Sequence, residues 1–321
     1  MEANARRLSV VVPVYNESAC LCAFHSRLVG TLESRVRDET EILYVNDGST
    51  DQTAGKLQQL CRDDARVRIL ELSRNFGHQA ALLAGLSRAA GDRIVMMDGD
   101  MQHPPELVPD MMEKANQGYD IVESRRVDSD DFGWIKRLTS RLFYWVFRHL
   151  SGLHLQPGMA DFRLVTAQVR NELLNLQEAE LFLRGAFVWM GFRKVCLTYR
   201  AEARGGGTSK YTMRKMMALA LSGLTAYSAL PLRLSLLLAA MSFACGSLYV
   251  VYACYAKFVA GNTVAGWTSL VMFNFFLFSC LFLLIGVMGE YIARIYQESK
   301  KRPPFIIRQE YGCGLARSAS E

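Results

Sequence analysis

The chain has 321 residues, half of them hydrophobic, and a formal net charge of +6 at neutral pH. That length suits one large domain or two smaller ones with cores of ordinary size. The positive charge does not indicate nucleic-acid binding, because no zinc-ligand spacing or RNA-binding signature accompanies it. Lys and Arg gather instead beside apolar stretches, which is typical of proteins that contact anionic lipid.

The cysteines and the N-terminal segment both indicate a reducing compartment. The eight cysteines form no matched pair of CxxC motifs, and this usage is not that of a disulfide framework. The apolar run that follows Arg6 and Arg7 is broken at Pro13 and Asn16, which makes it too short for a signal peptide. We therefore expect the N-terminal domain to stay in the cytoplasm.

The first 125 residues alternate between apolar, β-branched runs and helical stretches. Strands are expected at 8–14, 41–46, 67–72, 93–97 and 119–123, and helices up to about residue 37 and over 78–89. Alternation at this spacing predicts a mainly parallel sheet covered on both faces. Ligands of such sheets bind beyond the carboxyl ends of the strands, where Asp47 and Asp98 fall.

The segment 134–150 combines an apolar, aromatic face with a strongly basic one. An apolar stripe at helical spacing is often only the core-facing side of a helix. Here the basic residues on the polar side and the aromatic residues opposite favour an amphipathic helix that lies in the membrane interface.

Long uncharged runs in the last third predict membrane helices. The segment 234–256 lies between Arg233 and Lys257, and 267–289 belongs to a stretch without any charge. Each is long enough to cross the hydrocarbon. A third run, 216–232, is shorter and more polar, so it either spans the membrane or lies along its surface.

The distribution of Lys and Arg around these runs decides between two spans and three. Basic residues precede the first long run and follow the second, and only Lys257 lies between them. Two spans place both basic ends on the cytoplasmic side, as orientation by positive charge requires. We therefore expect an interfacial helix at 211–233 and a cytoplasmic tail at 290–321.

The strongest local signal for chemistry is Asp98-Gly99-Asp100, directly after an apolar run. Two carboxylates at a strand end can hold a divalent cation that bridges the phosphates of a nucleotide, and Mg²⁺ or Mn²⁺ suits this role. The pattern alone is weak evidence, because such pairs are common in loops. Its position after a strand, with Asp47 at the end of a neighbouring one, strengthens the interpretation.

Further motifs follow one another in order along nearly the whole chain. They are VVPVYNE (11–17), VNDGSTD (45–51), SRNFGHQAALLAG (73–85), DGDMQHPPE (98–106), DFRL (161–164), GGTSKY (206–211) and GEYIARIY (289–296). Together they resemble the motifs of family 2 glycosyltransferases of the polyprenyl-phosphate type, which include dolichol-phosphate mannose synthases and bactoprenol glucosyltransferases. No single motif would be specific, but the ordered set is.

The resemblance implies a site for the sugar donor. The residues that would border or bind the nucleotide sugar are Pro13, Tyr15, Glu17, Asp47, Asp98, Gln102 and Arg125. Asp98 and Asp100 would also hold the metal. His103 departs from the pattern, since relatives often carry an acidic or amide residue there; it is either a plain loop histidine or a change that alters the choice of metal.

The resemblance also implies an acceptor site at Asp161-Phe162-Arg163, where Asp161 would be the general base and Arg163 would hold the acceptor phosphate. A phosphate monoester has a second pKa near 6, so at neutral pH it is mostly a nucleophilic dianion already. Little proton abstraction is then needed. Asp161 acts either as a base or as a residue that orients the site.

Three consecutive glycines at 205–207 predict a loop, because they would cost too much entropy inside a helix or strand. The simplest interpretation is a linker. The flanking residues favour a loop that closes over a diphosphate, since cations there offset the charge that develops on the leaving group. These residues are Arg200, Arg204, Ser209 and Lys210.

We therefore expect an α/β protein with a Rossmann-like, A-type glycosyltransferase domain over 1–210, interfacial helices and two transmembrane helices. It would transfer a sugar, with inversion, from a nucleotide sugar to polyprenyl phosphate at the cytoplasmic face of the inner membrane, for modification of cell-envelope glycans such as lipopolysaccharide. UDP-hexose is the preferred donor, by analogy with bacterial relatives that have two C-terminal spans.

Other functions are compatible with parts of this pattern. A GDP-mannose donor would keep the reaction class, and a polysaccharide synthase would need more spans. A non-catalytic scaffold or a helper that flips lipids belongs to a different class, and the intact Asp98, Asp100, Asp161 and Lys210 argue against a decayed enzyme. The sequence leaves open the sugar, the length of the lipid and the formation of a homo-oligomer.

Overall fold

The computed structural model describes residues 7–36, 39–126, 159–176, 178, 181–199, 240–249, 251–252, 255, 258–259 and 266–312. The chain forms two compact units. One comprises Met1–Arg148, Leu153–Thr212 and Pro303–Glu321, and the other comprises His149–Gly152 and Met213–Arg302. The first unit therefore takes up the chain again after residue 302, which the sequence did not predict.

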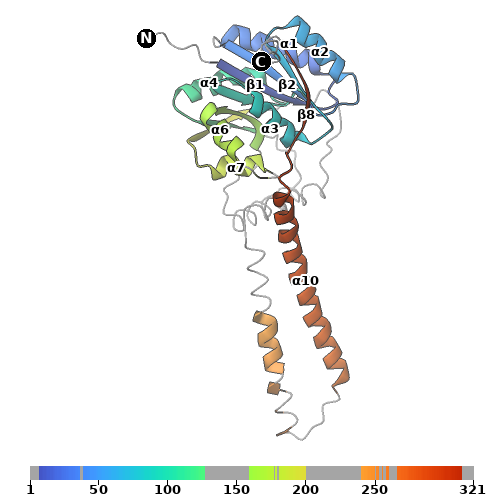
Figure 1. Cartoon of the computed structure of the whole chain (residues 1–321). Helices are drawn as coiled ribbons and strands as arrows, with labels where there is room; N and C mark the ends of the chain where they lie inside the picture. Colours follow the sequence, from blue (N-terminus) through green and yellow to red (C-terminus); the bar gives the residue numbers. More distant parts are fainter. Residues whose placement is uncertain are drawn as a thin grey trace. The chain divides into compact units, whose positions relative to one another are not determined.

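The first unit is built on an eight-stranded sheet with the strand order β7-β5-β6-β4-β1-β2-β3-β8 (Figure 1). Its strands are β1 (Arg7–Val14), β2 (Glu39–Asn46), β3 (Val67–Leu72), β4 (Arg93–Met96), β5 (Ile121–Arg126), β6 (Met159–Thr166), β7 (Lys194–Tyr199) and β8 (Ile307–Tyr311). β1 is parallel to β2 and β4, β2 to β3, and β5 to β7. β6 is antiparallel to both of its neighbours and β8 to β3, while the other six strands run in one direction, so the predicted, mainly parallel sheet contains two antiparallel strands.

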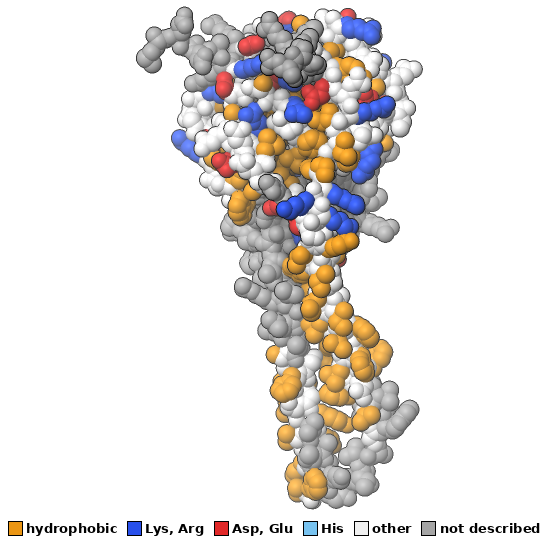
Figure 2. Space-filling model, viewed as in Figure 1, with side chains coloured by type: hydrophobic (Ala, Val, Ile, Leu, Met, Phe, Trp, Pro, Cys, Tyr) orange, Lys and Arg blue, Asp and Glu red, His pale blue; other side chains and the backbone are white. Residues whose placement is uncertain are grey.

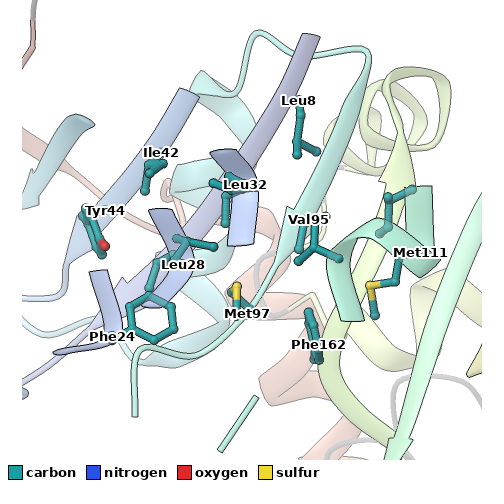
Figure 3. Close-up of a cluster of buried hydrophobic side chains, with 14 of the residues drawn as sticks. Leu8, Phe24, Leu28, Leu32, Ile42, Tyr44, Val95, Met97, Met111 and Phe162 are labelled. Carbon is teal, nitrogen blue, oxygen red and sulfur yellow. The ribbon is translucent and has the colours of Figure 1, made fainter. Parts of the chain in front are cut away.

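Helices cover both faces of this sheet, as the sequence predicted. One apolar layer contains side chains of α1 (Leu21–Arg35), α2 (Thr53–Asp63) and α4 (Val108–Asn116), the last preceded by the 3₁₀ helix η1 (Pro105–Leu107). The other contains side chains of α3 (His78–Arg88), α6 (Ala167–Asn175) and α7 (Leu183–Trp189). Figure 3 shows the first layer, in which Phe24 and Leu28 of α1 meet strand residues such as Ile42 and Tyr44.

The strand β1 shows why an unbroken apolar run predicts such an arrangement. Val10 and Val12 belong to the first layer and Val11 to the second, and all three are completely buried. Successive side chains of a strand point to opposite faces, so a strand covered on both faces must be apolar at every position. On the second face α3 approaches β1 so closely that a Cβ on Gly85 would lie 2.2 Å from Val11 Cγ1.

The segment beyond residue 289 differs from the expected tail. The helix α10 (Trp267–Ser299) begins where a span was predicted but continues past Gly289, and β8 then pairs with β3 at the edge of the sheet. The backbone N–H of Ser73 donates to Ile306 O at 3.0 Å, which extends this pairing. The β8 sequence IRQEY is too polar and too short to predict a strand, and its partner lies more than 200 residues earlier.

The second unit contains α10, which is apolar over most of its length. Among the described residues, one helix segment, Phe273–Ser299, is long and apolar enough to cross a membrane, with a mean hydropathy of 2.1 and none of its apolar window buried. Figure 2 shows hydrophobic side chains along this helix. The described residues 240–249, within the other predicted span, are helical. The predicted interfacial helices at 134–150 and 211–233 lie outside the described residues.

Candidate active site

The strands β1, β2, β3 and β4 are parallel, so their carboxyl ends lie together at one end of the sheet, which we call the ligand-binding edge. β6 runs the opposite way, so its first residues reach the same edge. Arg163 of β6 is paired with Met96 of β4. Asp98 follows the end of β4 and Asp161 lies near the start of β6, and His78 Nε2 is 3.5 Å from the first carboxylate and 3.7 Å from the second. The tertiary structure thus brings the predicted donor motif and the predicted acceptor motif together.

The loops that follow β1 and β2 are fastened to each other. Asn16 accepts a hydrogen bond from the Thr50 N–H at 2.8 Å, and the Glu17 N–H donates to Thr53 Oγ1 at 3.0 Å. Tyr15, which the sequence placed beside the nucleotide, is 41% exposed at this edge, whereas Pro13 is buried within β1. A stacking contact with a ligand is therefore open to Tyr15 but not to Pro13 in this structure.

Asp47 follows β2 and is only 3% exposed. Its two carboxylate oxygens accept the backbone N–H groups of Phe76 and Gly77, at 2.7 and 2.9 Å. Burial raises the pKa of Asp47, and the two N–H donors offset part of that rise. The observed role of Asp47 is to hold the loop that leads into α3, and its predicted contact with the base or ribose stays a prediction.

The loop after β4 carries the predicted metal ligands. The backbone N–H of Asp98 donates to His103 Nδ1 at 2.9 Å, so the proton of this imidazole is on Nε2. The His103 ring is buried and stacks on Phe162, with 5.1 Å between the ring centroids. His103 therefore fixes the backbone at Asp98 and is not an exposed loop histidine. Asp100 accepts the N–H of Gln102 at 3.1 Å, which closes the loop.

Glu17 lies beside the same loop through Cys20. The Cys20 sulfur is 3.2 Å from Glu17 Oε2 and 3.5 Å from the carbonyl oxygen of Gly99. Burial and the hydrogen bond to Glu17 raise the pKa of Cys20 to about 12. The thiol is thus a neutral donor that links the start of α1 to the Asp98 loop, and it is not a nucleophile.

His78, which the sequence analysis did not single out, lies between the two opposed carboxylates. Its Nε2 is 3.5 Å from Asp98 Oδ1 and 3.7 Å from Asp161 Oδ2. Desolvation lowers the pKa of His78, but the contact with Asp161 and the charges of Asp98 and Asp161 outweigh it and raise the pKa to about 9. Two facing carboxylates repel each other, and a protonated imidazole between them relieves that repulsion.

Asp161 also receives a guanidinium that the sequence analysis missed. Arg184 of α7 donates from Nε and Nη2 to the two oxygens of Asp161, at 2.8 and 2.9 Å. Burial would raise the pKa of Asp161, but the His78 contact and the charges of Arg184 and Arg163 hold it well below its usual range. A carboxylate surrounded in this way is a weak base, which favours the orienting role over general-base catalysis.

The structure does not give Arg163 the position that the sequence predicted. Its side chain is 2% exposed, its guanidinium lies 4.6 Å from the centre of the Phe187 ring, and Nη2 is 3.6 Å from Asp161 Oδ1. A group so deeply buried cannot hold the phosphate of an incoming lipid directly. Strand alternation is the reason, because Arg163 points into the layer beneath α7 while Phe162 points to the opposite face.

Two exposed arginines, Arg125 and Arg126, end β5 beside the donor loop. Arg126 donates to Gln102 Oε1 at 3.4 Å, a contact that the sequence analysis did not predict. The predicted contact of Arg125 with the donor stays a prediction. The predicted donor-loop residues Arg200, Arg204, Ser209 and Lys210 lie outside the described part of the chain.

The Asp98 loop fits a divalent cation that is held mainly by the substrate. Asp98 Oδ1 is buried and accepts no hydrogen bond from the residues that the structure describes. His78 Nε2 lies 3.5 Å from this oxygen, and a buried carboxylate oxygen without a hydrogen bond can also accept a metal cation. Within the same residues, no group of three or more acidic, His or Cys side chains forms a complete metal site. Asp98 and Asp100 would thus supply two ligands, and phosphate oxygens and water the rest.

Comparisons with known proteins agree with the motifs. A family model described as "Glycosyl transferase family 2" matches residues 9–174. A "Bactoprenol glucosyl transferase" of Shigella phage SfV is 37% identical over 308 residues, which cover 95% of this chain and 99% of that protein. An "Uncharacterized glycosyltransferase YkcC" of Bacillus subtilis is 36% identical over 304 residues, covering 95% and 94%.

A solved structure resembles the chain more distantly. It is glucosyl-3-phosphoglycerate synthase from Mycobacterium tuberculosis in complex with Mn²⁺, UDP-glucose and phosphoglyceric acid, with a TM-score of 0.46 and 20% identity over 68% of this chain and 78% of that one. The sequence matches therefore carry more weight. The family match includes Asp98 and Asp161, and the full-length relatives extend it through α7 and α10.

Proposed function

The chain belongs to glycosyl transferase family 2, and we propose that it transfers a hexose from a UDP-sugar to polyprenyl phosphate at the cytoplasmic membrane surface. The observation that carries this proposal is the arrangement across β4 and β6. The acidic loop with Asp98 and Asp100 lies across His78 from Asp161, a carboxylate that Arg163 and Arg184 also contact. Full-length relatives named bactoprenol glucosyl transferase support a lipid phosphate as the acceptor.

The reaction is a single in-line displacement. An oxygen of the acceptor phosphate attacks the anomeric carbon and forms the new C–O bond, while the bond from that carbon to the diphosphate breaks and the nucleoside diphosphate leaves with the electron pair. The configuration inverts. The acceptor dianion needs no base, so Asp161 stays ionised throughout and orients the cationic side chains around it.

Asp98 and Asp100 would hold Mg²⁺ or Mn²⁺ against the diphosphate. A bound cation there offsets the negative charge that develops on the leaving group. His103 and the Asp100–Gln102 hydrogen bond keep the backbone of this loop fixed, so the two carboxylates need little rearrangement to bind. The cationic residues of the 200–210 loop are proposed to contact the same diphosphate.

We further propose two membrane spans, 234–256 and 267–289, with 211–233 in the interface. The first unit contains residues both before and after this region, because β8 belongs to its sheet. A segment that leaves a folded domain and returns to it must cross the membrane an even number of times. In sealed cells, tags at residues 1 and 321 should both be protected and a tag near Gly261 accessible; external access to residue 321 alone would contradict this topology.

The donor and acceptor are tested together with purified protein, Mg²⁺ and a short polyprenyl phosphate. Labelled UDP-sugars and GDP-mannose are offered separately, and we expect label to enter the lipid from a UDP-sugar only. If label enters the lipid from GDP-mannose alone, the donor is GDP-mannose and not a UDP-sugar. No label from any donor, under conditions in which the protein binds UDP, would refute transfer to this lipid.

A further inference from the structure

We propose that Arg184 is the residue that binds the acceptor phosphate, and that its pairing with Asp161 holds the guanidinium ready for that contact. This inference rests on the proposed transfer to a phosphate acceptor and assigns one side chain of the site. The sequence analysis gave this role to Arg163. Substitution of Arg184 distinguishes the two assignments.

Arg184 lies on the helix α7, which is firmly packed. Leu183, Ala186 and Phe187 of this helix are buried in the apolar layer on its side of the sheet. The guanidinium donates to both oxygens of Asp161 from Nε and Nη2. Its orientation is thus fixed before any ligand arrives, which reduces the entropy lost on binding.

Arg184 also reaches the solvent, whereas Arg163 does not. The Arg184 side chain is 32% exposed and that of Arg163 is 2% exposed, although both contact the same carboxylate. Arg163 is in addition covered by the Phe187 ring. Among the two arginines at Asp161, Arg184 alone can meet a phosphate that enters from outside.

The Asp161 carboxylate is shared by two guanidiniums, those of Arg163 and Arg184. Glu123 also acts on the buried Arg163, so the exposed Arg184 is the guanidinium of this pair that a phosphate can reach. Arginine is well suited to the contact, because its guanidinium carries five N–H donors, and Asp161 accepts only from Nε and Nη2.

A second arginine in the same unit has nearly the same local geometry but two carboxylate partners. Arg66 donates from Nε and Nη2 to Asp64 at 2.9 and 2.8 Å, and its side chain is also 32% exposed. Arg66 Nη2 additionally binds Glu33 at 3.0 Å. The two carboxylates beside this guanidinium disfavour a phosphate there, which makes Arg66 a suitable control.

The experiment compares Arg184→Gln, Arg184→Lys and the matched control Arg66→Gln in the full-length protein. Arg184→Gln should raise the apparent KM for polyprenyl phosphate by about 10- to 100-fold, as expected for the loss of a hydrogen bond to a charged group. The KM for the nucleotide sugar should change less than about twofold. Arg184→Lys should recover part of the loss, since it keeps the charge but not the fork.

Arg66→Gln should leave both KM values and kcat unchanged. UDP binding, measured by calorimetry, and thermal unfolding separate a lost ligand contact from a damaged fold, and we expect Arg184→Gln to bind UDP as the unmodified protein does. If the unmodified protein transfers sugar to the lipid and Arg184→Gln keeps its acceptor KM, this inference is wrong while the proposed function stands. A failure of the unmodified protein to label the lipid refutes the proposed function instead.

Discussion

Glu41 and Asp161 are carboxylates at opposite ends of the sheet, with side chains 3% and 17% exposed, and their hydrogen-bond partners differ in kind. Glu41, at the amino end of β2, accepts hydrogen bonds from the Ser9 hydroxyl, the Ala90 N–H and the Arg68 guanidinium. Two of these three donors are uncharged, and Arg7 Nη2 lies further away, at 3.8 Å from Oε2. Asp161 is surrounded by charged or chargeable side chains from β6, α3 and α7.

This difference separates a stabilising carboxylate from one prepared for a ligand. Burial would raise the pKa of Glu41, but its hydrogen bonds to Ser9, Ala90 and Arg68 outweigh it and lower the pKa. The group joins β1, β2, β3 and the start of β4 into one frame. At Asp161 both oxygens accept hydrogen bonds from Arg184, a side chain that is 32% exposed. The buried carboxylate joins strands together, and the partly exposed one holds a cation that a ligand can reach.

The largest expected effect concerns Asp98, at the ligand-binding edge. Asp98→Ala should lower turnover by about 10²–10³-fold, because it removes a contact that supports charge on the leaving group, while thermal unfolding stays nearly unchanged. A chelator should abolish the activity of the unmodified protein, and Mg²⁺ or Mn²⁺ should restore it. Full activity in excess chelator would contradict the metal assignment.

Asp161→Asn tests whether this carboxylate is a base or an orienting group. A general base would contribute about 10²–10⁴-fold at all pH values. We expect a loss below about 10²-fold that shrinks as the pH rises through the acceptor pKa of about 6, because the phosphate then ionises by itself. A large loss of activity that persists at about pH 8 would show that Asp161 acts as a general base.

Glu41→Gln tests the opposite edge, where stability and not turnover should change. We expect a loss of about 1.5–3 kcal/mol in the free energy of unfolding, typical for hydrogen bonds to a charged group, with both KM values unchanged. Because the folded pKa of Glu41 is lowered, its contribution is fully present above the unfolded value of 4.5 and is lost as the pH falls through the folded value. An altered KM would show that the two edges are coupled.

Arg88→Ala replaces an exposed side chain and is a reference for the substitutions at Asp161 and Glu41. Arg88 Nε binds Glu310 Oε1 at 2.8 Å and joins α3 to β8, and its side chain is 50% exposed. Water screens such pairs, so the loss in the free energy of unfolding should be about 0–1 kcal/mol. The β8 strand would then stay in place through its backbone pairing with β3. A larger loss would show that the ion pair itself holds the strand.

Much of the fold followed from local patterns. The apolar runs that became β1 to β4 were recognisable because strands buried on both faces leave no position for a polar residue. β6 was not, because Asp161 and Arg163 interrupt its apolar character and their charges are satisfied only by partners from other elements. β8 was missed for a similar reason, since its pairing with β3 depends on a chain that returns from α10.

The active site likewise contains residues that local patterns identified and residues that they did not. Asp98, Asp100 and Asp161 were identified from motifs, and their spacing along the chain carried that information. His78 lay within a quoted motif, but nothing in its neighbours indicated that it would stand between two carboxylates. Arg184 had no local signal at all, because only the packing of α7 brings it to Asp161.

The sequence by itself determined the α/β alternation, the family, the acidic donor loop and the apolar C-terminal helix, because each depends on residue type and local period. The tertiary structure decided which arginine can meet a ligand. Arg163 was expected to face the acceptor, yet strand alternation turns it into the core, while Arg184 reaches the solvent beside the same carboxylate. Register and helix packing fix such choices, and both arise only when distant segments meet.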